Sequence, residues 1–143
     1  MIRFAVVGSN PSAPLSLFDP GRLLRATCAA VAHTDLAQAR QTASALGTHV
    51  TVASWDQLVQ QHAEDFDAVL IQASLGSRAA LIQQAAAVGK HVLVESPLAS
   101  TTDLADQAIE ACQAAAVRLM VGHDMRFLPS NMAVAQALKS GQL

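Results

Sequence analysis

Six apolar runs of strand length recur along the chain, and they constrain its fold more than any other feature. They cover residues 2–7, 27–32, 49–52, 68–73, 91–94 and 118–121. The runs are continuous rather than alternating with polar residues, which is typical of parallel strands covered by helices on both faces. Helical segments separate most of them. The sequence therefore predicts an α/β fold: a doubly wound, mostly parallel six-stranded Rossmann-type sheet in three layers.

Capping residues mark where the intervening helices should begin and end. Asp35 precedes a helical pattern that ends at Gly47, and Ser54 with Gln57 has the form of a capping box. The remaining helices are expected over residues 77–88, from Thr102, and from Pro129 to Gly141. The residues expected to face inward on the helices after Asp35 and Thr102 are Leu36, Ala39, Ala43, Leu46, Leu104, Ala108, Ile109 and Cys112.

The segment after the first run departs from this alternation. It contains Pro11, Pro14 and Pro20. A proline inside a helix costs about 3 kcal/mol and also disfavours helical geometry at the preceding residue. We therefore expect a loop over residues 9–18, followed by a short helix near residues 22–25, in place of a full first helix.

Length, charge and cysteine content limit the classes of function. The chain has 143 residues and a net charge of −2, so residues 1–143 are expected to form a single domain with no nucleic-acid or membrane-surface partner. No apolar stretch approaches the roughly 20 residues of a membrane span. Cys28 and Cys112 lie far apart, and each is expected to fill a small apolar space rather than form a disulfide or bind a metal. A cytoplasmic protein without a metal site is the expectation.

The first loop retains only part of a dinucleotide-binding pattern. Such a site uses glycines and a helix N-terminus near the pyrophosphate, and an acidic residue after the second strand for the ribose. Gly8 supplies the first glycine, but Asn10 and Ala13 stand at the other two glycine positions. His33 occupies the acidic position, with Asp35 two residues later. From these residues alone, an ordinary strand-to-loop turn is at least as well supported as a phosphate cradle.

Several short motifs resemble a known family. Gly89-Lys90-His91-Val92 leads to Glu95 and Pro97, and Arg126-Phe127 with Pro129 follows the last apolar run. Together they are similar to the N-terminal half of the Gfo/Idh/MocA family of NAD(P)-dependent oxidoreductases. The resemblance covers nearly the whole chain and implies a Rossmann domain that binds NAD or NADP. It also implies that the family's C-terminal α/β domain is absent after Leu143.

The departures from the family pattern cluster at functional positions. Ser96 stands where the resemblance implies a lysine associated with catalysis, and His33 and Asn10 replace the ribose acid and a loop glycine. The family's T-P-N-x-x-H motif reads Ala73 to Arg78 here and includes Ser74. A serine hydroxyl does not ionise near neutrality and cannot replace the ammonium group of lysine.

These observations predict a degenerate, non-catalytic relative that acts by binding a small ligand or a protein. The alternative is a sugar or polyol dehydrogenase subunit completed by a partner or by dimerisation, with His91 or His123 as substitute proton carriers. The candidate cofactor-binding residues are Gly8, Ser9, Asn10, His33, Ser74 and Glu95, with no catalytic group assigned at Ser96. For Glu95, bracing the following turn is an equally good interpretation. An apolar surface near the last strand or helix should be exposed, which favours self-association or a protein partner.

Overall fold

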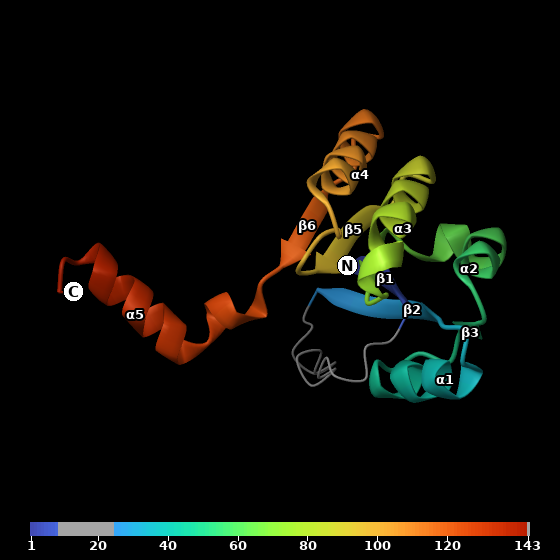
Figure 1. Cartoon of the computed structure of the whole chain (residues 1–143). Coiled ribbons are helices and arrows are strands. Elements are labelled where there is room, and N and C mark those ends of the chain that lie inside the picture. The colour runs from blue at the N-terminus through green and yellow to red at the C-terminus, as the bar shows by residue number, and fades with distance from the viewer. Residues whose placement is uncertain (9–24, 143) are drawn as a thin grey trace.

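The structure, a computed structural model, describes residues 1–8 and 25–142. Six strands form one sheet in the order β3-β2-β1-β4-β5-β6, and every pairing is parallel (Figure 1). The strands are β1 (Ile2–Val7), β2 (Ala26–Ala32), β3 (Thr51–Val52), β4 (Ala68–Ile71), β5 (His91–Glu95) and β6 (Leu119–Gly122). The predicted doubly wound sheet is confirmed. The predicted loop over residues 9–18 and most of the predicted helix near residues 22–25 lie outside the described residues.

Helices connect the strands, and α1 and α2 begin at the capping residues that the sequence indicates. They are α1 (Leu36–Ala45), α2 (Trp55–His62), α3 (Leu75–Ala87), α4 (Thr102–Ala114) and α5 (Pro129–Lys139), with the 3₁₀ turns η2 (Ala63–Asp65) and η3 (Asp124–Phe127). Asp35 Oδ1 accepts the backbone N–H of Ala37 at 2.8 Å, and Ser54 Oγ accepts that of Gln57 at 3.2 Å. Both contacts satisfy helix donors that would otherwise lack an intrahelical partner.

Two apolar cores cover the two faces of the sheet and give the molecule its three layers. On one face α1 packs its buried Ala39 and Ala43 against Val6 and Val31. On the other face α2, α3 and α4 pack against the sheet. Their buried residues are Leu58, Ile82, Ala85, Ala86, Ala108 and Cys112. Strand residues alternate between these cores, which explains why the strands read as continuous apolar runs.

Some boundaries and inward-facing residues differ from the sequence-based expectation. α3 begins at Leu75, two residues early, and the Ser77 hydroxyl lies inside its first turn, where it donates to the Ser74 carbonyl at 3.0 Å. Leu36 is 40% exposed because it precedes the buried stripe of α1 by one turn. Ile109 is 38% exposed because it lies one residue, about 100° of helix rotation, from the stripe formed by Ala108 and Cys112.

The C-terminal segment stands apart from the rest of the fold. Figure 1 shows η3 and α5 extending away from the sheet, so that the C-terminus lies far from the body of the molecule. No residue of α5 is buried. None of the described helices combines the length and the apolar character that crossing a bilayer requires.

Candidate functional site

The carboxyl ends of β1 and β4 lie next to each other at the centre of the sheet. β1 continues the sheet toward β2, whereas β4 continues it toward β5, so the chain winds away from this point in both directions. In open α/β sheets, ligands bind in the crevice outside the carboxyl ends of the strands at such a switch point. The residues that follow β1, β4 and β5 are therefore the candidates for a binding site.

Gly8 ends β1 with the backbone in a left-handed conformation. Its φ is +82°, and a Cβ at this position would lie 2.7 Å from the carbonyl oxygen of Gln72. The N–H of Gly8 donates to the carbonyl of Ala32 at 2.9 Å. Only glycine permits both the conformation and this close approach to the end of β4. The turn after β1 is thus held tightly at the switch point.

The N-terminus of α3 begins directly after β4 and lies at the same edge. Ser74 is exposed and extended, and its hydroxyl lies 2.9 Å from that of Ser77 rather than capping a backbone N–H. Because the first amides of a helix carry partial positive charge, this end of the 13-residue helix favours an anionic group. Ser74 and Gly8, two of the candidate residues, thus lie at the same edge of the sheet.

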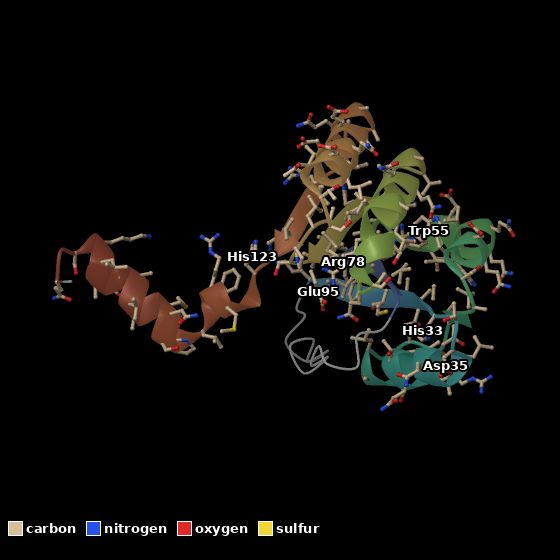
Figure 2. The ribbon with its side chains drawn as sticks, viewed as in Figure 1. His33, Asp35, Trp55, Arg78, Glu95 and His123 are labelled. Carbon is tan, nitrogen blue, oxygen red and sulfur yellow. The ribbon has the colours of Figure 1, made fainter. Side chains whose placement is uncertain are left out.

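Glu95 is part of a polar network rather than a free carboxylate (Figure 2). Gln72, which is 4% exposed, donates from Nε2 to Glu95 Oε1 at 3.3 Å. The Arg78 Nη2 lies 3.7 Å from Glu95 Oε2. Glu95 therefore braces the turn that it precedes, which was one of its two sequence-based interpretations, while its side chain keeps 28% exposure at the edge.

Arg78 and Gln72 belong to this polar network but were not among the candidate site residues predicted from the sequence. Arg78 donates to the carbonyls of Ala73 at 3.0 Å, Glu95 at 2.9 Å and Pro97 at 2.7 Å. One signal could have revealed it. Arg78 precedes Ile82 by four positions, so a charged side chain falls on the apolar stripe of α3, where it requires buried partners.

Ser96 lies beyond the end of β5, where the sequence placed it. It is exposed, and its backbone N–H donates to the carbonyl of Gly122 at 3.3 Å. This contact ties the turn to the end of β6. His123 follows Gly122 directly, so this exposed histidine comes off the sheet beside the Ser96 turn.

His33 follows β2 at the same edge and is joined to the start of α1. Its backbone N–H donates to the carbonyl of Val52 at 3.0 Å, and its Nδ1 accepts the backbone N–H of Asp35 at 2.9 Å. Asp35 uses its carboxylate to cap α1, as described above. Figure 2 shows both labelled residues near α1, away from Glu95 and Arg78. The position at which a ribose acid is usual therefore carries an imidazole.

The Lys90-His91 pair belongs to the opposite edge of the sheet and has structural partners. Lys90 Nζ donates to the carbonyl of Ala63 at 2.7 Å and lies 5.0 Å from the centre of the Phe66 ring. His91 Nδ1 accepts the backbone N–H of Arg118 at 3.0 Å. The hypothesis that His91 replaces the catalytic lysine is wrong, because His91 starts β5 at the amino edge of the sheet.

The remaining sequence-based candidates divide into two groups. Ser9 and Asn10 lie outside the described residues. Cys28 and Cys112 are free thiols and are buried, as expected, and burial raises the pKa of the Cys28 thiol to about 12, so that it stays protonated. Within residues 1–8 and 25–142, no group of three or more His, Cys, Asp or Glu residues is arranged to hold a metal ion.

Comparison with known proteins places this geometry among oxidoreductases. A family model described as an oxidoreductase family with an NAD-binding Rossmann fold, Gfo/Idh/MocA, matches residues 2–123. The D-apiose dehydrogenase of Paraburkholderia graminis is 33% identical over 88 residues, which cover 62% of this chain and 24% of that protein.

Solved structures show the same fold. An oxidoreductase from Agrobacterium radiobacter in complex with NAD⁺, L-tartaric acid and magnesium superposes with a TM-score of 0.88 at 24% identity, over 98% of this chain and 40% of that one. The scyllo-inositol dehydrogenase from Lactobacillus casei with bound NAD(H) and scyllo-inositol gives 0.86 at 22% identity, over 99% and 42%. The chain thus spans less than half the length of the proteins it matches.

Proposed function

The chain belongs to the Gfo/Idh/MocA family of oxidoreductases as an NAD-binding Rossmann domain, and from this premise we propose that it binds a nicotinamide dinucleotide without completing hydride transfer by itself. One observation carries the proposal. The strand ends at the switch point are tightly built, with Gly8 against Gln72, yet the turn after β5 presents Ser96 where the family resemblance implies a lysine. The chain therefore has the fold that positions a cofactor in this family, but it has serine in place of the lysine that the family resemblance links to catalysis.

The residues at the carboxyl edge of the sheet suit the pyrophosphate and the nicotinamide of a dinucleotide, but they suit its adenosine ribose less well. Gly8 and the N-terminus of α3 would lie by the pyrophosphate, His33 by the adenosine ribose, and the Glu95–Ser96 turn toward the nicotinamide. When bound, the dinucleotide supplies the hydride donor or acceptor. The poor fit is at His33, because an imidazole does not accept two ribose hydroxyls as a carboxylate does.

Ser96 limits what the chain can do with a bound cofactor. A positioned acid–base group typically contributes a factor of about 10²–10⁴ to the rate. A neutral hydroxyl offers neither the proton nor the positive charge of lysine. His123 lies exposed beside the same turn and is the imidazole that the structure describes there. The variant Ser96→Lys introduces an ammonium group at this position. It should therefore raise the rate of any polyol or sugar oxidation by at least about tenfold.

Titration with NADH and NADPH, followed by nicotinamide fluorescence, tests the binding. We expect saturable binding of both, with NADPH bound at least as tightly as NADH, because His33 lacks the negative charge that would repel a 2′-phosphate. Ser140→Ala, at the residue that caps the C-terminus of α5, is a control variant and should bind both cofactors as the unmodified chain does. No binding of either cofactor at millimolar concentration would refute the binding half of the proposal. Rapid oxidation of a sugar or polyol by the unmodified chain would refute the other half.

A second candidate function is a dehydrogenase completed by another polypeptide. The chain covers only 40% and 42% of the two solved oxidoreductases, and the names of the relatives point to sugar or polyol substrates. A second polypeptide would then supply the substrate-binding part. Purification from the natural host distinguishes the two candidates: a co-purifying polypeptide with NAD(P)-dependent polyol oxidation would favour this second function.

A further inference from the structure

Among the described residues, the buried class contains a single charged side chain, that of Arg78, which is 8% exposed. A buried guanidinium group is unfavourable unless carbonyl or carboxylate oxygens pair with it. α3 carries it on the face that also buries Ile82 and Ala85. Burying a charged side chain lowers the stability of the fold unless polar groups compensate its charge. The groups that compensate Arg78 therefore indicate what the residue does.

All the partners of Arg78 lie at the strand ends that surround the proposed cofactor site. Its Nε bonds the carbonyl after β4, at Ala73, and its Nη1 bonds two carbonyls of the turn after β5, at Glu95 and Pro97. Arg78 therefore joins α3 to both strands and fixes the backbone on either side of Ser96. The planar guanidinium fork suits this role, because it holds several acceptors in fixed directions.

The fourth partner of Arg78 is a charged group, the side-chain carboxylate of Glu95. The Glu95 carboxylate lies 3.7 Å from Nη2, is oriented by Gln72 on its other oxygen, and keeps 28% side-chain exposure. A dinucleotide carries a negatively charged pyrophosphate, and a carboxylate at the same sheet edge repels it unless a cation offsets the charge of the carboxylate. Arg78 supplies such a cation next to Glu95, from a buried position on α3.

We propose that Arg78 is a positioning residue of this site, one that holds the Glu95–Ser96–Pro97 turn and neutralises Glu95 so that an anionic dinucleotide can share the edge with a carboxylate. This inference rests on the proposed cofactor binding. It assigns Glu95 an indirect role: the carboxylate anchors the arginine and does not hold the ligand.

Charge-changing variants of the two residues, titrated with NADH by fluorescence, test the inference. Arg78→Met removes the cation that lies beside Glu95, and we expect the dissociation constant to rise roughly tenfold or more. The double variant Arg78→Met/Glu95→Gln removes both charges and should recover most of that loss. Glu95→Gln alone keeps the cation and should bind NADH at least as tightly as the unmodified chain.

The pattern of outcomes separates the alternatives. Circular dichroism and thermal unfolding establish which variants fold, and if Arg78→Met does not fold, Glu95→Gln carries the test on its own. Binding weakened more than about tenfold in Glu95→Gln would mean that the carboxylate contacts the ligand, which overturns the inference. A double variant as weak as Arg78→Met would make Arg78 purely structural, which also overturns it. Failure of the unmodified chain to bind would instead refute the proposed function, and with it the premise of this inference.

Discussion

Gly8 allows the backbone of β1 to approach the end of β4 closely at the switch point, because glycine has no side chain. Gly8→Ala would place a Cβ 2.7 Å from the Gln72 carbonyl oxygen, in a backbone with φ of +82°. We expect the free energy of unfolding to fall by about 2–4 kcal/mol, because left-handed strain and a backbone clash add together. Urea unfolding measures the change.

The matched control is Gly76→Ala, where an added Cβ meets no atom within 4 Å. Gly76 lies inside α3, so alanine there should be neutral or stabilise by up to about 1 kcal/mol. Equal losses from the two substitutions would show that the close approach at Gly8 is not what requires glycine.

The pair of Arg3 and Asp67 at the amino edge of the sheet predicts a specific acid dependence. Arg3 Nη2 lies 2.6 Å from Asp67 Oδ1, and the backbone N–H of Arg3 donates to Oδ2 at 3.0 Å. These hydrogen bonds to Arg3 lower the pKa of Asp67 from 3.8 to about 2. Since the folded-state pKa is lowered, the stabilisation is present above about pH 4 and is lost as the pH falls from 4 toward 2.

Asp67→Asn should therefore flatten the fall in unfolding free energy between about pH 4 and pH 2. Chemical unfolding at several pH values measures the slope, and Asp106→Asn on the exposed face of α4 is the control. The interpretation would be contradicted if Asp67→Asn retained the full slope of the unmodified chain in that window.

At the scale of elements, the sequence predicted the sheet well because its signals are local. Continuous apolar runs marked all six strands, and Asp35 and Ser54 cap the helices they were expected to cap. The site was predicted less completely. Strand ends could be located, but the sequence does not show which distant carbonyls a buried Arg78 reaches, since residues 78 and 95 to 97 meet only through the packing of α3 on β5.

Helix α5 is the element that the fold supports least. It has 11 residues, none of them buried, and an isolated helix shorter than about 12–15 residues is only marginally stable in water. In dilute solution we expect the amides of α5 to exchange with deuterium within minutes, whereas those of β1 and β4 exchange only on global unfolding. Hydrogen exchange followed by mass spectrometry tests this. Protection of α5 equal to that of β4 at the lowest concentration would contradict it.

At the scale of the whole molecule, the fold divides into a well-packed body and an apolar C-terminal face. The large apolar side chains exposed between the end of η3 and the end of α5 are Phe127 (69%), Leu128 (42%), Met132 (55%), Val134 (51%) and Leu138 (60%). The expectation of an exposed apolar surface near the last strand or helix is confirmed. The five residues expose on the order of 500 Å², which approaches the roughly 800 Å² that one partner contributes to a standard interface.

We propose a second copy of this chain as the occupant of this face. From Leu128 to Leu138 the chain carries no charged side chain, so two copies can bury this stretch around a two-fold axis without burying a charge. We expect the mass in solution, measured by analytical ultracentrifugation, to rise from monomer to dimer with concentration, and the protection of α5 amides to rise with it.

Leu138→Lys should shift the equilibrium toward monomer because burying an unpaired ammonium group is unfavourable, whereas Val88→Lys at the end of α3 should not. A monomer at all concentrations would refute self-association and leave this face to a different protein.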